Sequence, residues 1–182
     1  IMKEKNIPYN SISAVEFDET EYQKALSIDL ENSFIVNDDF HNYCLTTRDK
    51  FDLIIGNPPY IRYQYFSKDQ QTLAEQIFRK SGLKYTKLTN AWVSFVVGSS
   101  QLLKEKGKIA FVLPAELLQV SYAQQLREFL AHFYNKINIV SFEKLVFPEI
   151  QQEVVLLLCE KDGTSSHKIE HLELRNAESL KN

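Results

Sequence analysis

Cysteine is scarce in this sequence, and the two that occur, Cys44 and Cys159, are far apart. They form no Cys-x-x-Cys pair, which argues against a disulfide framework and a zinc site. Long apolar runs are also absent, since none approaches the roughly 20 residues that a membrane-spanning helix needs. The first residues, IMKEKNIPYNS, lack the apolar centre of a signal peptide. We therefore expect a cytoplasmic protein without membrane contact.

Glycine is scarce as well, and its distribution is informative. The five glycines are Gly56, Gly82, Gly98, Gly107 and Gly163, and they form no glycine-rich cluster. A nucleotide-binding α/β sheet usually begins with a central strand that feeds such a cluster. Because the sequence also begins with residues typical of the end of a helix, we expect a fragment of a larger protein, cut after its first strand and helix.

With 182 residues, of which 44% are hydrophobic, the chain can bury a substantial core as one domain. Strand-like and helix-like patterns alternate along it, which predicts a doubly wound α/β fold. The expected strands are 11–17, 33–36, 51–56, 108–114, 137–142 and 153–160, followed by an edge strand at 167–174. The expected helices are 18–30, about 90–104 and about 115–133, with a turn at 104–108. The mostly apolar run of 51–56 favours a central strand covered on both faces.

The net charge of -3 argues against a surface that is basic all over, but basic residues cluster between positions 62 and 87. Aromatic residues are interleaved with them. The segment contains the bases Arg62, Lys68, Arg79, Lys80, Lys84 and Lys87, the acids Asp69 and Glu75, and the aromatics Tyr63, Tyr65, Phe66, Phe78 and Tyr85. This mixture suits a surface that binds phosphates and stacks bases, and a solvated helix face explains it about as well.

Strand 51–56 ends in Gly56-Asn57-Pro58-Pro59-Tyr60, at the edge where open α/β sheets bind ligands. Each proline fixes its own φ and keeps the preceding residue extended, so the tetrapeptide Asn57–Tyr60 is stiff. It presents two neutral acceptors, the Asn57 amide oxygen and the Pro58 carbonyl, beside the ring of Tyr60. Two such acceptors suit a planar ring with an exocyclic amino group, because hydrogen bonds from both N–H groups aim the nitrogen lone pair at an electrophile. No metal is required for that step.

The run FDLIIGNPPYIRY resembles motif IV of the S-adenosylmethionine-dependent amino methyltransferases, in particular the N6-adenine DNA methyltransferases of restriction-modification systems. The resemblance implies a Rossmann-like fold, mostly parallel with an antiparallel strand near the C-terminal end. It assigns catalysis to Asn57, Pro58, Pro59 and Tyr60. Methyltransferases that act on RNA or on a protein glutamine carry the same tetrapeptide, so both remain alternatives.

Other segments extend the resemblance from about residue 13 to residue 160. SAVEFDETEYQKAL resembles motif II, which implies that Glu16 binds the ribose of the cofactor. VNDDF resembles motif III, which implies that Asp39, preferred over Asp38, and the following Phe40 contact the cofactor adenine. KLVFPEIQQEVVLLL resembles motif VIII, which implies that Phe147 packs on the target base, on the face opposite the motif IV tyrosine. The alternatives are a solvated acid, a turn aspartate and two core phenylalanines.

Motif III reaches motif IV in under about twenty residues, which is the gamma order of the family and leaves no room for a recognition domain between them. The resemblance implies a site-specific DNA adenine N6-methyltransferase, the modification part of a type I or fused type II restriction system. Its cofactor would be S-adenosylmethionine and its partner double-stranded DNA. A glycine-rich motif I segment would lie upstream, and a target recognition domain beyond the edge strand and tail at 161–182.

The missing first strand bears on how this chain would behave alone. Without it, the strands on either side would carry unpaired backbone groups, which are costly when buried. We therefore expect residues 1–182 to form a single, partial catalytic domain that depends on upstream residues or self-associates. An inactive structural or DNA-positioning module is the remaining alternative.

Overall fold

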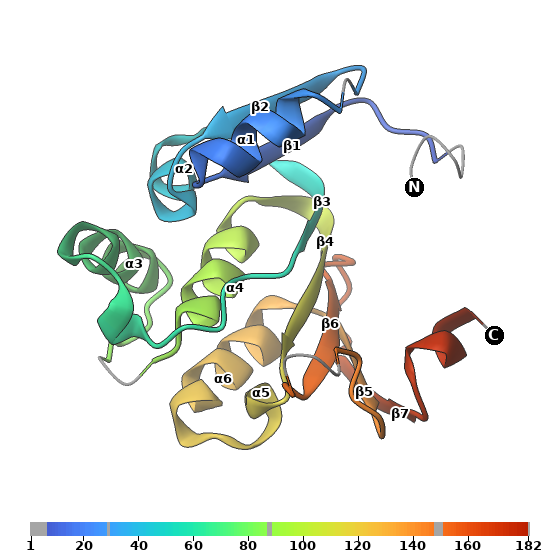
Figure 1. Ribbon diagram of the computed structural model, residues 1–182. Coiled ribbons are helices and arrows are strands. Elements are labelled where there is room, and N and C mark those ends of the chain that lie inside the picture. Colours follow the sequence, from blue (N-terminus) through green and yellow to red (C-terminus); the bar gives the residue numbers. More distant parts are fainter. Residues whose placement is uncertain (1–6, 29, 87–88, 148–150, 182) are drawn as a thin grey trace.

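Two β-sheets carry the fold of this computed structural model, which describes residues 7–28, 30–86, 89–147 and 151–181 (Figure 1). The first pairs β1 (Ile12–Glu16) with β2 (Ser33–Asn37) in parallel. The second has the order β3-β4-β6-β5-β7. Its strands are β3 (Phe51–Gly56), β4 (Leu103–Pro114), β5 (Lys136–Phe142), β6 (Val154–Glu160) and β7 (Lys168–Leu174). Strand β6 is antiparallel to both of its neighbours, whereas β3 with β4 and β5 with β7 pair in parallel. The predicted α/β sheet with one antiparallel strand near the C-terminal end is confirmed.

The helices lie mainly on one face of the five-stranded sheet, where α4, α5 and α6 cover it (Figure 1). Helix α3 packs against α2 and α4. The large side chains Trp92, Leu113, Leu126 and Leu157 are fully buried between these helices and the sheet. The α-helices are α1 (Glu19–Leu26), α2 (Phe40–Thr46), α3 (Lys68–Lys80), α4 (Ala91–Gln101), α5 (Glu116–Gln119) and α6 (Gln124–Phe133). Short 3-10 turns are η1 (Tyr63–Tyr65), η2 (Ser121–Ala123) and η4 (Ala177–Lys181).

Several helix predictions need correction. Helices α2 and α3 were not among the expected elements, and α1 ends four residues before the predicted residue 30. The single helix predicted for 115–133 is wrong, because the chain is extended at Val120, with ψ 145°. The break leaves backbone carbonyls without helical N–H partners. The Arg127 guanidinium donates to two of them, Leu117 O and Val120 O, at 3.0 Å each. Such a long-range cap leaves no local pattern for sequence reasoning to detect.

The turn predicted at 104–108 lies inside β4 as a bulge. Phe51 pairs with Leu103 while Leu53 pairs with Lys108, so β4 carries extra residues opposite a short piece of β3. The bulge bends the chain through a left-handed φ of 62° at Lys106. A Cβ on Gly107 would lie 2.9 Å from the Lys104 carbonyl oxygen, which explains why glycine occupies this position.

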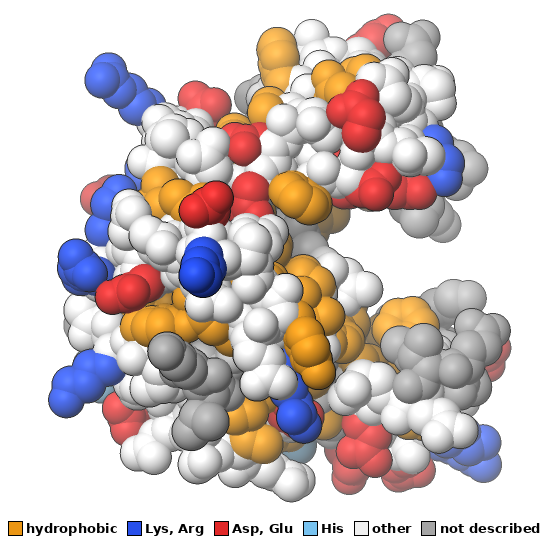
Figure 2. Space-filling model, turned by 60° about the vertical axis from the view of Figure 1, so that its left-hand side comes forward, with side chains coloured by type: hydrophobic (Ala, Val, Ile, Leu, Met, Phe, Trp, Pro, Cys, Tyr) orange, Lys and Arg blue, Asp and Glu red, His pale blue; other side chains and the backbone are white. Residues whose placement is uncertain are grey.

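Strand β3 is not covered on both faces, contrary to the prediction. It is the edge strand of its sheet, and Leu53 and Ile55 lie exposed, the latter at 70%. In the described residues no strand pairs with the outer edge of β3, and the helices of its own sheet lie on the opposite face. The two-stranded sheet stands apart from β3 in Figure 1, and Figure 2 shows a hollow with hydrophobic side chains along its border below that sheet.

Candidate active site

The stiff tetrapeptide lies at the C-terminal end of β3, where the sequence placed it. Strand β3 ends at Gly56, because the two prolines that follow shortly afterwards have no N–H to donate to a ladder. Pro58 is buried and acts as the anchor, whereas Asn57 and Pro59 are exposed. Glycine is required before them, since a Cβ on Gly56 would lie 2.8 Å from the ring of Phe111 on β4.

Tyr60 has a role that the sequence did not reveal. Its hydroxyl lies 2.8 Å from Asn57 Oδ1 and 2.9 Å from the Val112 carbonyl oxygen on β4, and can donate to either. Burial raises the pKa of Tyr60 to about 12, so the hydroxyl keeps its proton at neutral pH. Because an amide oxygen has two acceptor positions, Asn57 Oδ1 retains one for another donor. The hydroxyl thus fixes the direction in which that free position points.

Two acids follow the neighbouring strands β1 and β2. Glu16 is the last residue of β1 and pairs in register with Asn37, so Glu16 and the nearby Asp39 leave the same edge of the two-stranded sheet. The Glu16 carboxylate accepts one hydrogen bond, from the Asp18 amide at 2.9 Å. Asn37 Nδ2 donates to the Glu16 carbonyl at 3.1 Å and ties the two strand ends together.

Asp39 is held from three directions. Its Oδ1 accepts from the backbone N–H of His41 at 2.8 Å, which caps α2, and lies 3.0 Å from His41 Nδ1. Its Oδ2 accepts from Gln70 Nε2 at 2.8 Å. Burial would raise the pKa of Asp39, but hydrogen bonds from His41 and Gln70 outweigh it and lower this pKa to about 2. The carboxylate is therefore ionised, and Oδ2 retains one free acceptor position.

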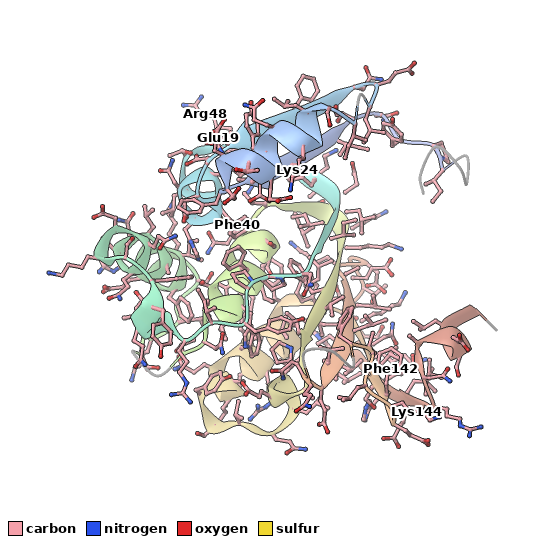
Figure 3. The ribbon with its side chains drawn as sticks, in the orientation of Figure 1. Glu19, Lys24, Phe40, Arg48, Phe142 and Lys144 are labelled. Atoms are coloured by element: carbon pink, nitrogen blue, oxygen red, sulfur yellow. The ribbon has the colours of Figure 1, made fainter. Side chains whose placement is uncertain are left out.

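Asp38 and Phe40, the neighbours of Asp39, contact other side chains of α2 and α4. Both Asp38 oxygens accept from Asn42 Nδ2, at 3.0 and 2.8 Å, so this carboxylate braces α2. Phe40 stacks on Phe95 of α4, with ring centroids 4.7 Å apart. Figure 3 shows Phe40 at the junction of α2 and α4. The ring is half-buried and packs against the core, and contact with a cofactor adenine stays a prediction.

Phe147 lies in the connection between β5 and β6, of which residues 148–150 fall outside the described part. It is partly exposed and forms an isolated antiparallel bridge with Gln152. The Ala115 N–H donates to the Glu153 carbonyl at 2.9 Å, which ties this connection to the end of β4. Phe147 is thus at the same edge of the sheet as the tetrapeptide, because β4 is parallel to β3.

The aromatic residues of the basic segment do not form a stacking surface. Tyr63, Phe66 and Phe78 are buried in the core, and of the aromatics there only Tyr65, at 72%, is highly exposed. The described part of the segment contains η1 and α3, and its basic side chains are exposed, those of Lys68, Arg79 and Lys80 on α3 and those of Arg62 and Lys84 beside it. Lys87 lies outside the described residues. Of the two explanations that the sequence left open, the helix face is the one observed for these residues.

Sequence reasoning missed His41, Gln70 and Ser94 as part of this site. One local signal was available for Gln70: Ser67-Lys68-Asp69-Gln70 matches a capping box, which the structure contains at the start of α3. His41 and Ser94 are joined across 53 residues and gave no local signal.

Comparison with known proteins identifies the family. A family model described as Eco57I restriction-modification methylase matches residues 2–147. The chain belongs to this methylase family. It is 26% identical over 175 residues to the type II methyltransferase M.AccI of Acinetobacter calcoaceticus, covering 93% of this chain and 31% of that protein. It is 31% identical over 114 residues to the type II restriction enzyme and methyltransferase RM.Eco57I of Escherichia coli, covering 62% of this chain and 11% of that protein. The chain spans less than a third of these relatives.

Solved structures show that the Eco57I-family chain has the expected fold. A Listeria monocytogenes protein described as a class I S-adenosylmethionine-dependent methyltransferase matches 100% of this chain and 54% of its own, with TM-score 0.75 and 17% identity. A type I restriction-modification methyltransferase subunit from Streptococcus thermophilus matches 87% of this chain and 35% of its own, with TM-score 0.67 and 18% identity. The Rossmann-like methyltransferase fold predicted from the sequence is confirmed.

Two other kinds of feature are absent from the described residues. None of their helices is long and apolar enough to cross a membrane. Within the same ranges, no three or more His, Cys, Asp or Glu side chains are grouped so as to hold a metal ion.

Proposed function

We propose that this methylase-family chain is the catalytic part of a DNA adenine N6-methyltransferase, the modification component of a restriction-modification system. The observation that carries the proposal is the exposed Asn57 at the end of β3, whose amide oxygen is oriented by the Tyr60 hydroxyl at 2.8 Å. A neutral acceptor held in this way suits the exocyclic amine of a base. Pro58, buried beside it, supplies a second acceptor through its carbonyl oxygen.

The chemistry follows from what these acceptors do to an aromatic amine. Its lone pair is delocalised into the ring, and hydrogen bonds from its two N–H groups to Asn57 and Pro58 favour a pyramidal nitrogen. Contacts that strengthen toward the transition state accelerate the reaction. With S-adenosylmethionine as donor, the nitrogen lone pair would form the new bond to the methyl carbon as the carbon–sulfur bond breaks, and the surplus proton on nitrogen would leave to solvent. Pro59 keeps the segment extended so that both acceptors stay in place.

S-Adenosylmethionine would supply an electrophilic methyl group, and the acids at the ends of β1 and β2 suit its polar groups. Asp39 has one unoccupied acceptor position for an amine N–H, and the Glu16 carboxylate, which accepts one hydrogen bond, suits a ribose diol. Phe40 adjoins Asp39 and would pack on the cofactor adenine. These three assignments rest on the family resemblance together with the local geometry.

The target adenine would have to leave the duplex, because its amino group is inaccessible within the stack. Tyr60 and Phe147 would then contact its two faces. Both residues follow strand ends at one edge of the sheet, which supports the assignment. Double-stranded DNA is accordingly the proposed substrate.

Among the described residues no strand pairs with the outer edges of β1 and β3, which bears on the partners of this chain. We propose that a strand from an upstream motif I segment completes the sheet in the full-length protein, where a target recognition domain selects the site. Self-association of these 182 residues is the alternative way to cover the exposed apolar residues of β3. Analytical ultracentrifugation of the isolated chain and of the full-length protein distinguishes the two, because only self-association as the native arrangement predicts a stable dimer of both.

Methylation assays with labelled cofactor test the proposal directly. The full-length protein is offered duplex DNA, RNA and a glutamine-containing protein substrate, and we expect label on adenine N6 of the DNA. Asn57→Ala should nearly abolish transfer while DNA affinity stays within about twofold, and Asn10→Ala, which changes an exposed asparagine near the N-terminus, serves as the control. Retained turnover in the Asn57 variant, or label on RNA or protein alone, would overturn the assignment.

A further inference from the structure

A buried hydrogen-bonded series links Asp39 to the interior of the protein. His41 Nδ1 lies 3.0 Å from Asp39 Oδ1, and His41 Nε2 lies 2.8 Å from Ser94 Oγ on α4. The side chain of His41 is 1% exposed, and Ser94 is 2% exposed. The order Asp-His-Ser is that of a nucleophilic triad, but Ser94 Oγ is also close enough to donate to the Ala91 carbonyl at 2.8 Å, and no substrate can reach it. The series therefore has a different role.

The imidazole of His41 is fixed in direction as well as in position. Three phenylalanine rings surround it edge-on, with centroids 5.8 Å away for Phe40, 5.4 Å for Phe66 and 4.8 Å for Phe95. Nδ1 faces the Asp39 carboxylate and thus carries a proton, while Nε2 faces the Ser94 hydroxyl. Rotation of the ring would lose both hydrogen bonds inside an apolar enclosure, where such a loss is costly.

The number of acceptor positions on Asp39 shows what this fixation achieves. An ionised carboxylate accepts at about four positions. His41 takes both on Oδ1, through its backbone N–H and its ring, and Gln70 takes one on Oδ2. One position remains, on a side chain that is still 16% exposed. The carboxylate thus offers a single acceptor in a direction set by α2, α3 and α4.

We propose that His41 is a positioning residue for the cofactor: held by Ser94, it directs the last free acceptor of Asp39 toward one N–H donor, the exocyclic amine of an adenine ring. This inference rests on the proposed function, in which Asp39 binds that amine. It adds that the buried helix α4 takes part in cofactor binding through a residue that touches no ligand. Methyl transfer itself would be unaffected, because Asn57 and Tyr60 follow β3, a strand of the other sheet.

Steady-state kinetics of the full-length protein test the proposal. His41→Leu removes the donor, whereas His41→Asn keeps an N–H at the same number of bonds from Cα as Nδ1. We expect His41→Leu to raise KM for S-adenosylmethionine about tenfold or more. This is the factor that a hydrogen bond to a charged group contributes, here the bond from the adenine amine to the Asp39 carboxylate. kcat at saturating cofactor should change less than about twofold, and His41→Asn should restore most of the affinity. Ser94→Ala should raise KM by about threefold, and Ser99→Ala, another buried serine of α4, should leave it unchanged.

A double-mutant cycle separates positioning from a general structural role. If His41 acts through Asp39, His41→Leu has no further effect on KM once Asp39→Asn is present, although thermal unfolding still reports its effect on stability. Additive effects on KM, or a loss of kcat in place of affinity, would overturn the positioning role. Should His41→Leu fail to fold, the same cycle is run with Ser94→Ala.

The same experiment also tests the premise that Asp39 binds the adenine amine of the cofactor. Wild-type protein without methyl transfer, or Asp39→Asn without effect on KM, would overturn the proposed role of Asp39 and the positioning role with it. A raised KM in Asp39→Asn together with a normal KM in His41→Leu would overturn the positioning role alone.

Discussion

Replacing Tyr60 by phenylalanine separates two roles that one side chain is expected to have. The ring would contact the target base, and the hydroxyl, 2.8 Å from Asn57 Oδ1, would orient the proposed acceptor. Phenylalanine keeps the ring and removes only the oxygen. The Val112 carbonyl, 2.9 Å from the hydroxyl, would also lose the donor that this single proton can offer it in place of Asn57.

The size of the effect follows from the hydrogen bond that phenylalanine cannot form. A hydrogen bond between neutral groups contributes about 0.5–1.5 kcal/mol, so kcat of Tyr60→Phe should fall by about 2- to 10-fold. Tyr60→Ala also removes the ring, and stacking on a base is worth about 1–3 kcal/mol. The alanine variant should therefore be at least about fivefold slower than the phenylalanine variant. DNA binding should weaken only in the alanine variant.

Single-turnover methylation of a duplex oligonucleotide, with cofactor and DNA saturating, measures this step without product release. Thermal unfolding of each variant shows whether removing the hydrogen bond to Val112 has altered the fold. A phenylalanine variant as fast as wild type would refute the orienting role of the hydroxyl. Equal rates for the phenylalanine and alanine variants would refute the role of the ring.

Three further outcomes are expected. The pKa of Asp39 is lowered from 3.8 to about 2 in the fold, so the stability that its ionised form contributes is present above pH 3.8 and lost as the pH falls through 2. Urea unfolding of wild type and Asp39→Asn should accordingly differ at pH 7 and converge toward pH 2; an equal difference at both would contradict this. Gly107→Ala should lower the free energy of unfolding by about 1–3 kcal/mol, because the new Cβ would lie 2.9 Å from Lys104 O, and an unchanged urea midpoint would contradict that. Calorimetry with the isolated 182 residues should show S-adenosylmethionine binding weaker than micromolar, because no ladder joins the sheet of Glu16 to β3 in the described residues; micromolar affinity would contradict it.

The fold was predictable to the extent that local pattern decides it. The strands were found because their apolar runs are bounded by breakers, and β7 was expected at an edge because its pattern alternates. Helices α2 and α3 were missed; α2 is short, and its N-cap residue, Asp39, also resembled a ligand-binding turn. The break at Val120 was missed because Arg127, seven residues later, satisfies it. The exposure of Ile55 was missed because the apolar sequence of a strand does not show whether another element covers it.

The sequence by itself determined the stiff strand end and the acids after the first two strands, because both depend on residues adjacent in the chain. Proline geometry fixes the backbone of the Asn57–Tyr60 segment whatever surrounds it. Only the tertiary structure decided how the functional groups are aimed. Tyr60 reaches Val112 across 52 residues, Gln70 reaches Asp39 across 31, and His41 reaches Ser94 across 53. Contacts at such separations exist only after the sheet and α4 have packed, which is why no local pattern contains them.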